Sequence, residues 1–262
     1  MRRVYILPNV ITAASMMCGL LAIFNVLQGD YETACYQILV AGVLDFLDGK
    51  VARLTNTSSS FGMHFDSLSD LVAFGVAPAI LMFSWLTAKP LGLDERAATG
   101  VCVPFAICGA LRLARFNVQA GRHESHDFTG LPIPAAAAAM VGLYFLGDSY
   151  GNLGVSDKLL ARVAASFVIL VAYLMVSTIH YPSLKHVVLS RRKSFDMLVA
   201  MVLLSGLIIV LKHELKILVS IAAYAYVSIG VALHVRRRVT ASDGFPERSI
   251  RRELAEGPEE EE

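Results

Sequence analysis

Four aspartates stand close together in the first third of the chain, at Asp45, Asp48, Asp66 and Asp70. Residues three or four positions apart share one face of a helix, so Asp45 and Asp48 form one acidic face and Asp66 and Asp70 form another. Two antiparallel helices joined near residues 55–61 would bring these faces together. The spacing therefore predicts a cluster of four carboxylates.

Such a cluster repels itself unless cations neutralise it. Carboxylates without His or Cys partners suit hard cations such as Mg²⁺ or Mn²⁺, and two divalent cations would balance four aspartates. A pair of such ions is typical of phosphoryl transfer. Interhelical ion pairs or helix caps explain the pattern less well, because a cap needs one acid and not four on two facing stripes.

Small residues and one arginine accompany the acids. Gly49, Ala52 and Gly62 would let a nucleotide approach the helix backbone, where a larger side chain would block it. Arg53 could clamp a diphosphate. The surroundings of the acids therefore favour a nucleotide substrate.

A cation transporter is an alternative of a different class, since aspartates within membrane helices can also line an ion path. The acids here gather at one end of two helices, however, and none recurs at matching depth toward the other side. A purely structural role would not require the spacing. An enzyme is therefore the favoured interpretation.

The complete pattern resembles the signature of the CDP-alcohol phosphotransferase family. It reads Asp45-x2-Asp48-Gly49-x2-Ala52-Arg53-x8-Gly62-x3-Asp66-x3-Asp70, and all eight fixed positions of the signature are present. The resemblance implies a six-helix catalytic core, usually a homodimer. It also implies that Asp45, Asp48 and Asp66 bind metal, that Asp70 binds metal or acts as the general base, and that Gly49, Ala52, Arg53 and Gly62 help to hold the CDP moiety.

Weaker motifs resemble the phosphatidylserine synthase branch of that family. Leu7-Pro8-Asn9-x2-Thr12 is similar to the opening of this branch, which implies that Asn9 and Thr12 lie near the nucleotide. The alternative is an Asn-Thr pair that only bonds one helix to another.

Arg112-Leu-Ala-Arg115-Phe116-Asn117 also resembles that branch, as does the segment from Phe128 to Pro134. We expect Arg112, Arg115 and Asn117 to bind the alcohol, because arginine offers a bidentate fork to the carboxylate of L-serine. A positive anchor at the end of a helix is the alternative for the arginines. The expected reaction is phosphatidyl transfer from CDP-diacylglycerol to L-serine, with glycerol 3-phosphate or inositol phosphate as the alternative acceptors.

The elements that must position these residues are membrane helices. Apolar residues make up 55% of the 262-residue chain, and the mean hydropathy is +0.58, more than a soluble core of this size could hide. Since about 20 apolar residues span a bilayer, the sequence predicts an all-α membrane protein of about eight spans. These are expected at 5–28, 32–54, 62–87, 96–119, 131–148, 157–180, 195–212 and 214–235.

The distribution of positive charge predicts the orientation. An even number of spans puts both termini on one side, and 17 of the 23 Lys and Arg residues would then share that side. The positive-inside rule makes this side cytoplasmic, so the active site is expected to face the cytoplasm from the cytoplasmic membrane. The basic clusters are expected at anionic lipid headgroups, with no binding of nucleic acid.

The chain is expected to divide into three parts. Residues 1–182 form the catalytic membrane core, and 183–238 form a cytoplasmic loop with two further helices. Residues 239–262 form an acidic tail that cannot bury enough apolar surface to order itself. The four cysteines lie in apolar runs without metal-type spacing, and we interpret them as packing residues.

Overall fold

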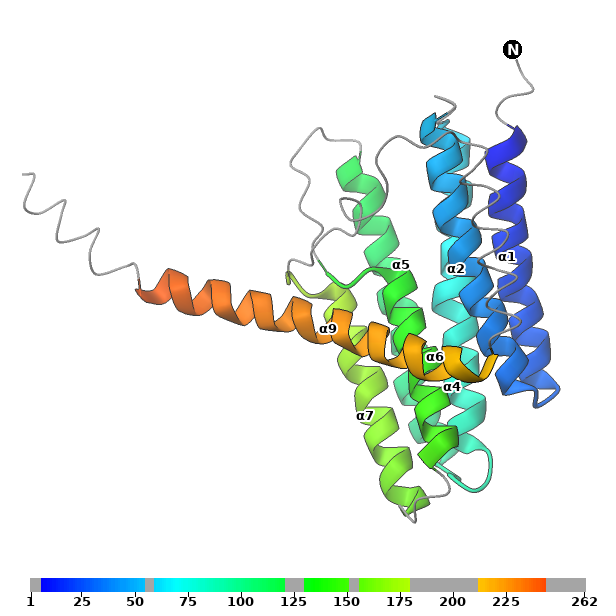
Figure 1. Ribbon diagram of the computed structural model, residues 1–262, viewed down its shortest axis with the longest axis vertical. Helices are drawn as coiled ribbons and strands as arrows, with labels where there is room; N and C mark the ends of the chain where they lie inside the picture. The colour runs from blue at the N-terminus through cyan, green and yellow to red at the C-terminus, as the bar shows by residue number, and fades with distance from the viewer. Residues whose placement is uncertain (1–5, 55–58, 121–129, 151–155, 180–211, 244–262) are drawn as a thin grey trace, which may run out of the picture.

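The computed structural model describes residues 6–54, 59–120, 130–150, 156–179 and 212–243 (Figure 1). All regular elements within these ranges are helical. The helices are α1 (Ile6–Leu27), α2 (Tyr31–Leu54), α3 (Ser60–Asp70), the π-helical turn η1 (Leu71–Val76), α4 (Ala77–Thr87), α5 (Glu95–Ala120), α6 (Ile133–Tyr150), α7 (Asp157–Val176) and α9 (Lys212–Asp243).

Four of the described helices are long and apolar enough to cross a membrane, namely Pro8–Leu27, Ser60–Thr87, Glu95–Val118 and Asp157–Val176. The second of these is one continuous rod made of α3, η1 and α4. The helix α2 is equally long but carries four charged residues in its C-terminal half, at Asp45, Asp48, Lys50 and Arg53. The prediction of an all-α, polytopic membrane protein is confirmed.

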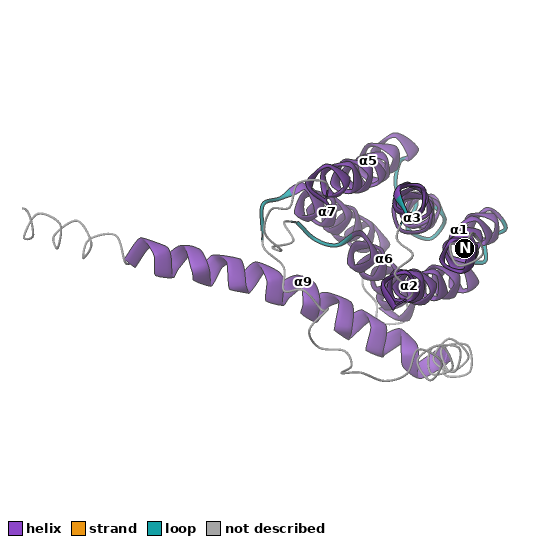
Figure 2. Cartoon of the chain, turned by 90° about the horizontal axis from the view of Figure 1, so that it is seen from above, coloured by secondary structure: helices purple, strands orange, loops and turns teal. Residues whose placement is uncertain are grey.

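The helices α1 to α7 run up and down along a common direction (Figure 1). Seen from above, α3 lies between α5 on one side and α1 and α2 on the other (Figure 2). Large apolar side chains such as Phe74, Phe105 and Phe145 are completely buried between the helices. This packing gives α3 neighbours on both flanks, which matters for the acids that it carries.

The start of α6 depends on one glycine. Gly130 has a φ of 87°, a conformation that side chains rarely adopt, and its N–H donates to the carbonyl of Ile179 at 2.8 Å. The next residue, Leu131, donates to the carbonyl of Leu174 at 3.0 Å. The segment that precedes α6 is thereby tied to the end of α7.

The helix α9 runs across the other helices at a steep angle and does not lie alongside them (Figure 1). It packs on α6, where the buried Ser220 hydroxyl donates to the carbonyl of Gly142 at 3.2 Å, and Lys216 pairs with Glu32 of α2 at 3.1 Å. A count of eight spans is therefore not confirmed. Most of the predicted span 195–212 and the tail from residue 244 lie outside the described residues, so the three-part division stays a prediction.

Candidate active site

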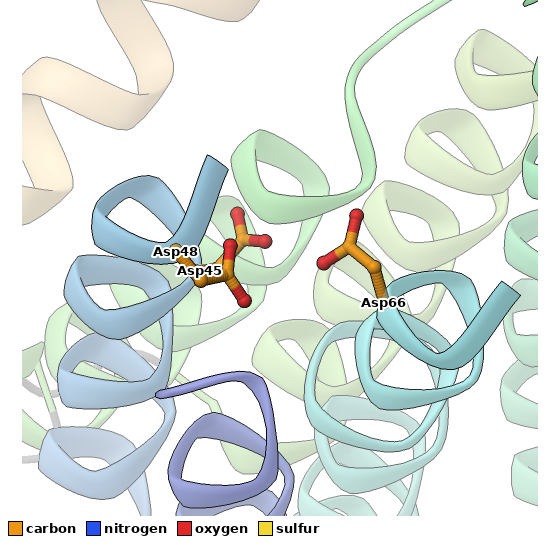
Figure 3. Close-up of side chains that lie close together, drawn as sticks. All are labelled: Asp45, Asp48 and Asp66. Carbon is orange, nitrogen blue, oxygen red and sulfur yellow. The ribbon is translucent and has the colours of Figure 1, made fainter. Parts of the chain in front are cut away.

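Asp45 and Asp48 of α2 and Asp66 of α3 point into the space between these two helices (Figure 3). One carboxylate oxygen from each of Asp45, Asp48 and Asp66 lies within 4.8 Å of the others, an arrangement that could hold a metal ion. The fourth acid, Asp70, lies close enough to Asp45, Asp48 and Asp66 to interact with them electrostatically. The structure thus brings together all four acids that the sequence singled out.

The cluster fits hard cations. Asp48 is only 5% exposed, and the Oδ1 atom of Asp66 is buried without a hydrogen-bond partner among the described residues. A buried carboxylate oxygen without a donor is costly, and four acids at this proximity repel one another. Cations coordinated by these oxygens would remove both costs, and the all-oxygen donor set is the one that Mg²⁺ and Mn²⁺ prefer.

The helix α1 supports the acids from a third side. Thr12 is buried, and its hydroxyl oxygen lies 2.6 Å from the Asp48 carboxylate, to which it donates. The carbonyl of Thr12 in turn accepts a hydrogen bond from the buried Ser69 hydroxyl at 3.1 Å. The predicted nucleotide-binding Thr12 therefore also orients an acid.

Ser69 was not assigned a role from the sequence. Its signal is a small polar residue inside the acid motif, at a position that the motif leaves open. That signal is weak, because a serine within a membrane helix commonly bonds to its own backbone. Only the packing of α3 against α1 shows that the Ser69 hydroxyl bonds to Thr12 of α1 and not to its own helix.

The predicted nucleotide residues lie near the same end of the bundle. Ser59 caps α3 by accepting the Gly62 N–H at 3.0 Å. A Cβ added at Gly62 would lie 3.3 Å from the Asn9 Oδ1 atom, so Asn9 and Gly62 are neighbours. Ala52 and Arg53 belong to the last turn of α2, and their side chains lie outside the described part of the chain.

The three predicted alcohol-binding residues, all on α5, have different environments. Arg112 is partly buried and interacts electrostatically with Asp70, and its Nε atom has no hydrogen-bond partner among the described residues. Arg115 is exposed. Asn117 donates through Nδ2 to the Ser67 hydroxyl at 2.9 Å, which links α5 to α3. Among the three, Arg112 is the residue with an unused donor beside the acids.

Comparison with known proteins identifies a family that the chain matches. The family model described as CDP-alcohol phosphatidyltransferase matches residues 5–179. This range contains all four acids and all three predicted alcohol-binding residues, and it excludes α9.

Individual relatives extend over a similar range. A CDP-diacylglycerol–serine O-phosphatidyltransferase of Helicobacter pylori is 41% identical over 184 residues, which cover 70% of this chain and 74% of the relative. A protein of the same name from Bacillus subtilis is 35% identical and is covered over 91% of its length, against 68% of this chain. An archaetidylserine synthase of Methanothermobacter thermautotrophicus is 39% identical, with 67% of this chain and 69% of the relative covered.

Proposed function

The chain belongs to the CDP-alcohol phosphatidyltransferase family, and we propose that it transfers the phosphatidyl group of CDP-diacylglycerol to L-serine, giving phosphatidylserine and CMP. The observation that carries the chemistry is the cluster of Asp45, Asp48 and Asp66 with Asp70 beside it. The choice of acceptor is supported by the names of the relatives in Helicobacter pylori and Bacillus subtilis.

Four acids would hold two divalent cations, Mg²⁺ or Mn²⁺, with Asp45, Asp48, Asp66 and Asp70 as ligands. When bound, such cations neutralise the negative charge that develops on the phosphate oxygens during transfer. Thr12 keeps the Asp48 carboxylate in its orientation through the hydrogen bond of 2.6 Å. The protein's own contribution is thus a set of oxygens fixed by three helices.

Asp70 is the proposed general base. Its carboxylate accepts the proton of the serine hydroxyl, and the serine oxygen attacks the lipid-linked β-phosphate. The bond between this phosphorus and the oxygen bridging to CMP breaks, and CMP leaves with the electron pair. Asn9, Thr12, Gly49, Ala52, Arg53 and Gly62 are proposed to hold the CDP moiety during this exchange.

Arg112 is proposed to bind the carboxylate of serine. It lies on α5 near Asp70, and its guanidinium retains an unpaired Nε donor among the described contacts. A bidentate guanidinium fits a planar carboxylate better than an ammonium does. We propose secondary roles for Arg115, which lies one turn further along the helix, and for Asn117.

The proposed reaction is tested by CMP release from the purified protein with CDP-diacylglycerol and each candidate alcohol. Release with L-serine, but not with glycerol 3-phosphate or inositol phosphate, is expected. Release with one of the phosphorylated alcohols and not with serine would disprove the acceptor while leaving the phosphatidyl-transfer chemistry intact. Absence of release with every alcohol would contradict the proposed reaction.

We further propose that the protein is a homodimer in the cytoplasmic membrane and that its site faces the cytoplasm. The orientation rests on the bias of Lys and Arg residues. Single cysteines introduced at Ser59 and at Ser156 of a cysteine-free variant should then be labelled to different extents by an impermeant thiol reagent added to intact cells. Labelling is expected at Ser156→Cys only, and labelling at Ser59→Cys only would reverse the orientation.

A further inference from the structure

The rod that carries Asp66 and Asp70 is not a uniform α-helix. Directly after Asp70 it widens into the π-helical turn η1, in which the N–H of Ala77 donates to the carbonyl five residues back, on Val72. An α-helix would bond four residues back, so the turn holds one residue more than an α-helical turn would. Such turns are uncommon and are frequently found at functional sites.

The sequence supplies a reason for the wide turn. Pro78 stands at the start of α4, where its ring would collide with the carbonyl of Phe74 in a continuous α-helix. A wider preceding turn moves that carbonyl away. The position of Pro78 therefore favours a π turn between Asp70 and α4.

The surrounding helices hold this turn tightly. A Cβ added at Gly19 of α1 would lie 2.6 Å from the Ala73 Cα atom, closer than real side chains come. On the other flank, a Cβ at Gly109 of α5 would lie 2.8 Å from the Ile133 Cδ1 atom and 3.8 Å from the Gly75 Cα atom. The centre of η1 is thus fixed from both sides, and Ala73, Phe74 and Gly75 are buried.

The part of the rod before the turn makes different contacts. Ser69 bonds to α1 through the carbonyl of Thr12, and Ser67 bonds to Asn117 of α5. These bonds fix one rotation of α3 about its axis. In that rotation Asp66 points toward Asp45 and Asp48 (Figure 3).

We propose that η1 is a positioning element that sets the rotation of α3, so that Asp66 and Asp70 face the acids of α2, and that Gly19 is the residue that lets α1 hold it there. The wide turn holds one residue more than an α-helical turn over the same rotation, and it thereby keeps α3 in this orientation. Since each residue of an α-helix turns it by about 100°, one further residue in the rod would swing the side chains of α3 away from α2. This role rests on the proposed function, because it concerns the ligands of the same site.

The test inserts one alanine directly after Val72 in the full-length protein and measures Mn²⁺ affinity by electron paramagnetic resonance without substrate. The dissociation constant is expected to rise at least about tenfold, since a two-helix ligand set becomes a one-helix set. Val72→Ala is the matched control, because it introduces an alanine into the same turn but keeps the length of the turn. It should stay within about twofold of wild type. Equal Mn²⁺ affinity in the insertion variant and in wild type would overturn the positioning role.

A second variant keeps the proposal testable if the insertion variant does not fold. Gly19→Ala adds the Cβ that meets Ala73 and should also weaken Mn²⁺ binding and lower kcat, with little change in the KM for CDP-diacylglycerol. Gly100→Ala is its control, because nothing lies within 4 Å of a Cβ added there. Unchanged binding in Gly19→Ala would overturn its role. A wild-type protein that binds no Mn²⁺ would overturn the proposed function and the positioning role together.

Discussion

Replacing Asp66 with Asn is expected to reduce turnover by about 10³-fold or more. The substitution keeps the size of the side chain but removes the charge from an oxygen that is buried without another partner among the described residues. Loss of a metal ligand removes several kcal/mol of charge stabilisation in the transition state, and about 4 kcal/mol corresponds to that factor. The measurement is the rate of CMP release at saturating Mg²⁺. Asp45→Asn, Asp48→Asn and Asp70→Asn should behave alike.

Thr12→Val provides a graded comparison for the Asp66 variant. It removes the hydrogen bond to Asp48 and leaves every acid in place. A hydrogen bond to a charged group contributes about 1.5–3 kcal/mol, and support of this kind typically affects metal affinity by about 10- to 100-fold. Higher Mg²⁺ should restore much of the activity of Thr12→Val and none of that of Asp66→Asn. Full activity of the wild-type protein in EDTA, or full activity of Asp66→Asn, would contradict metal-assisted transfer.

Replacing Arg112 with Lys is expected to raise the KM for serine by about 10- to 100-fold while changing the KM for CDP-diacylglycerol little. Lysine keeps the charge but loses the planar fork, so one charge-assisted hydrogen bond to the carboxylate is lost. Steady-state kinetics with each substrate varied in turn measures the difference. The pattern would identify a residue that binds the acceptor and not the nucleotide.

Arg96→Lys is the matched control for Arg112→Lys. Arg96 stands on the same helix, α5, but at the opposite end from the acids, and it is exposed. Its substitution should leave both KM values unchanged. A rise in the KM for CDP-diacylglycerol in Arg112→Lys would instead place the guanidinium at the diphosphate, and equal effects at both arginines would indicate a general loss of helix stability.

Most of the bundle could be predicted from the sequence because bilayer thickness fixes the length of each apolar run. The expected spans 32–54 and 157–180 match α2 and α7 to within a few residues, and α6 begins directly after Pro132. The orientation of α9 could not be predicted in this way. Hydropathy gives the length of a helix but not its direction, which depends on contacts such as those of Ser220 with Gly142.

The acids of the site could be predicted because helical spacing is local, and Asp45 and Asp48 need only one helix to share a face. The contacts that support these acids could not be predicted. Thr12 bonds to an acid 36 residues away, and Asn117 bonds to Ser67 across 50 residues, so no periodicity reveals either contact. The turn η1 was missed for a related reason, since a proline in a helix predicts a disturbance but not its form.

The contacts of Thr12 also bear on how the chain enters the membrane during synthesis. An ionised side chain at bilayer depth costs about 2.5–3.5 kcal/mol on insertion scales, and α2 carries Asp45 and Asp48. The helix α1 emerges from the ribosome first and already holds the hydroxyl that meets Asp48, whereas Ser69 of α3 emerges later and completes the set. When α2 enters the membrane, Asp48 can therefore accept a hydrogen bond from Thr12 of α1, the helix synthesised just before it. The first 70 residues are accordingly expected to insert as one cooperative unit, and not helix by helix.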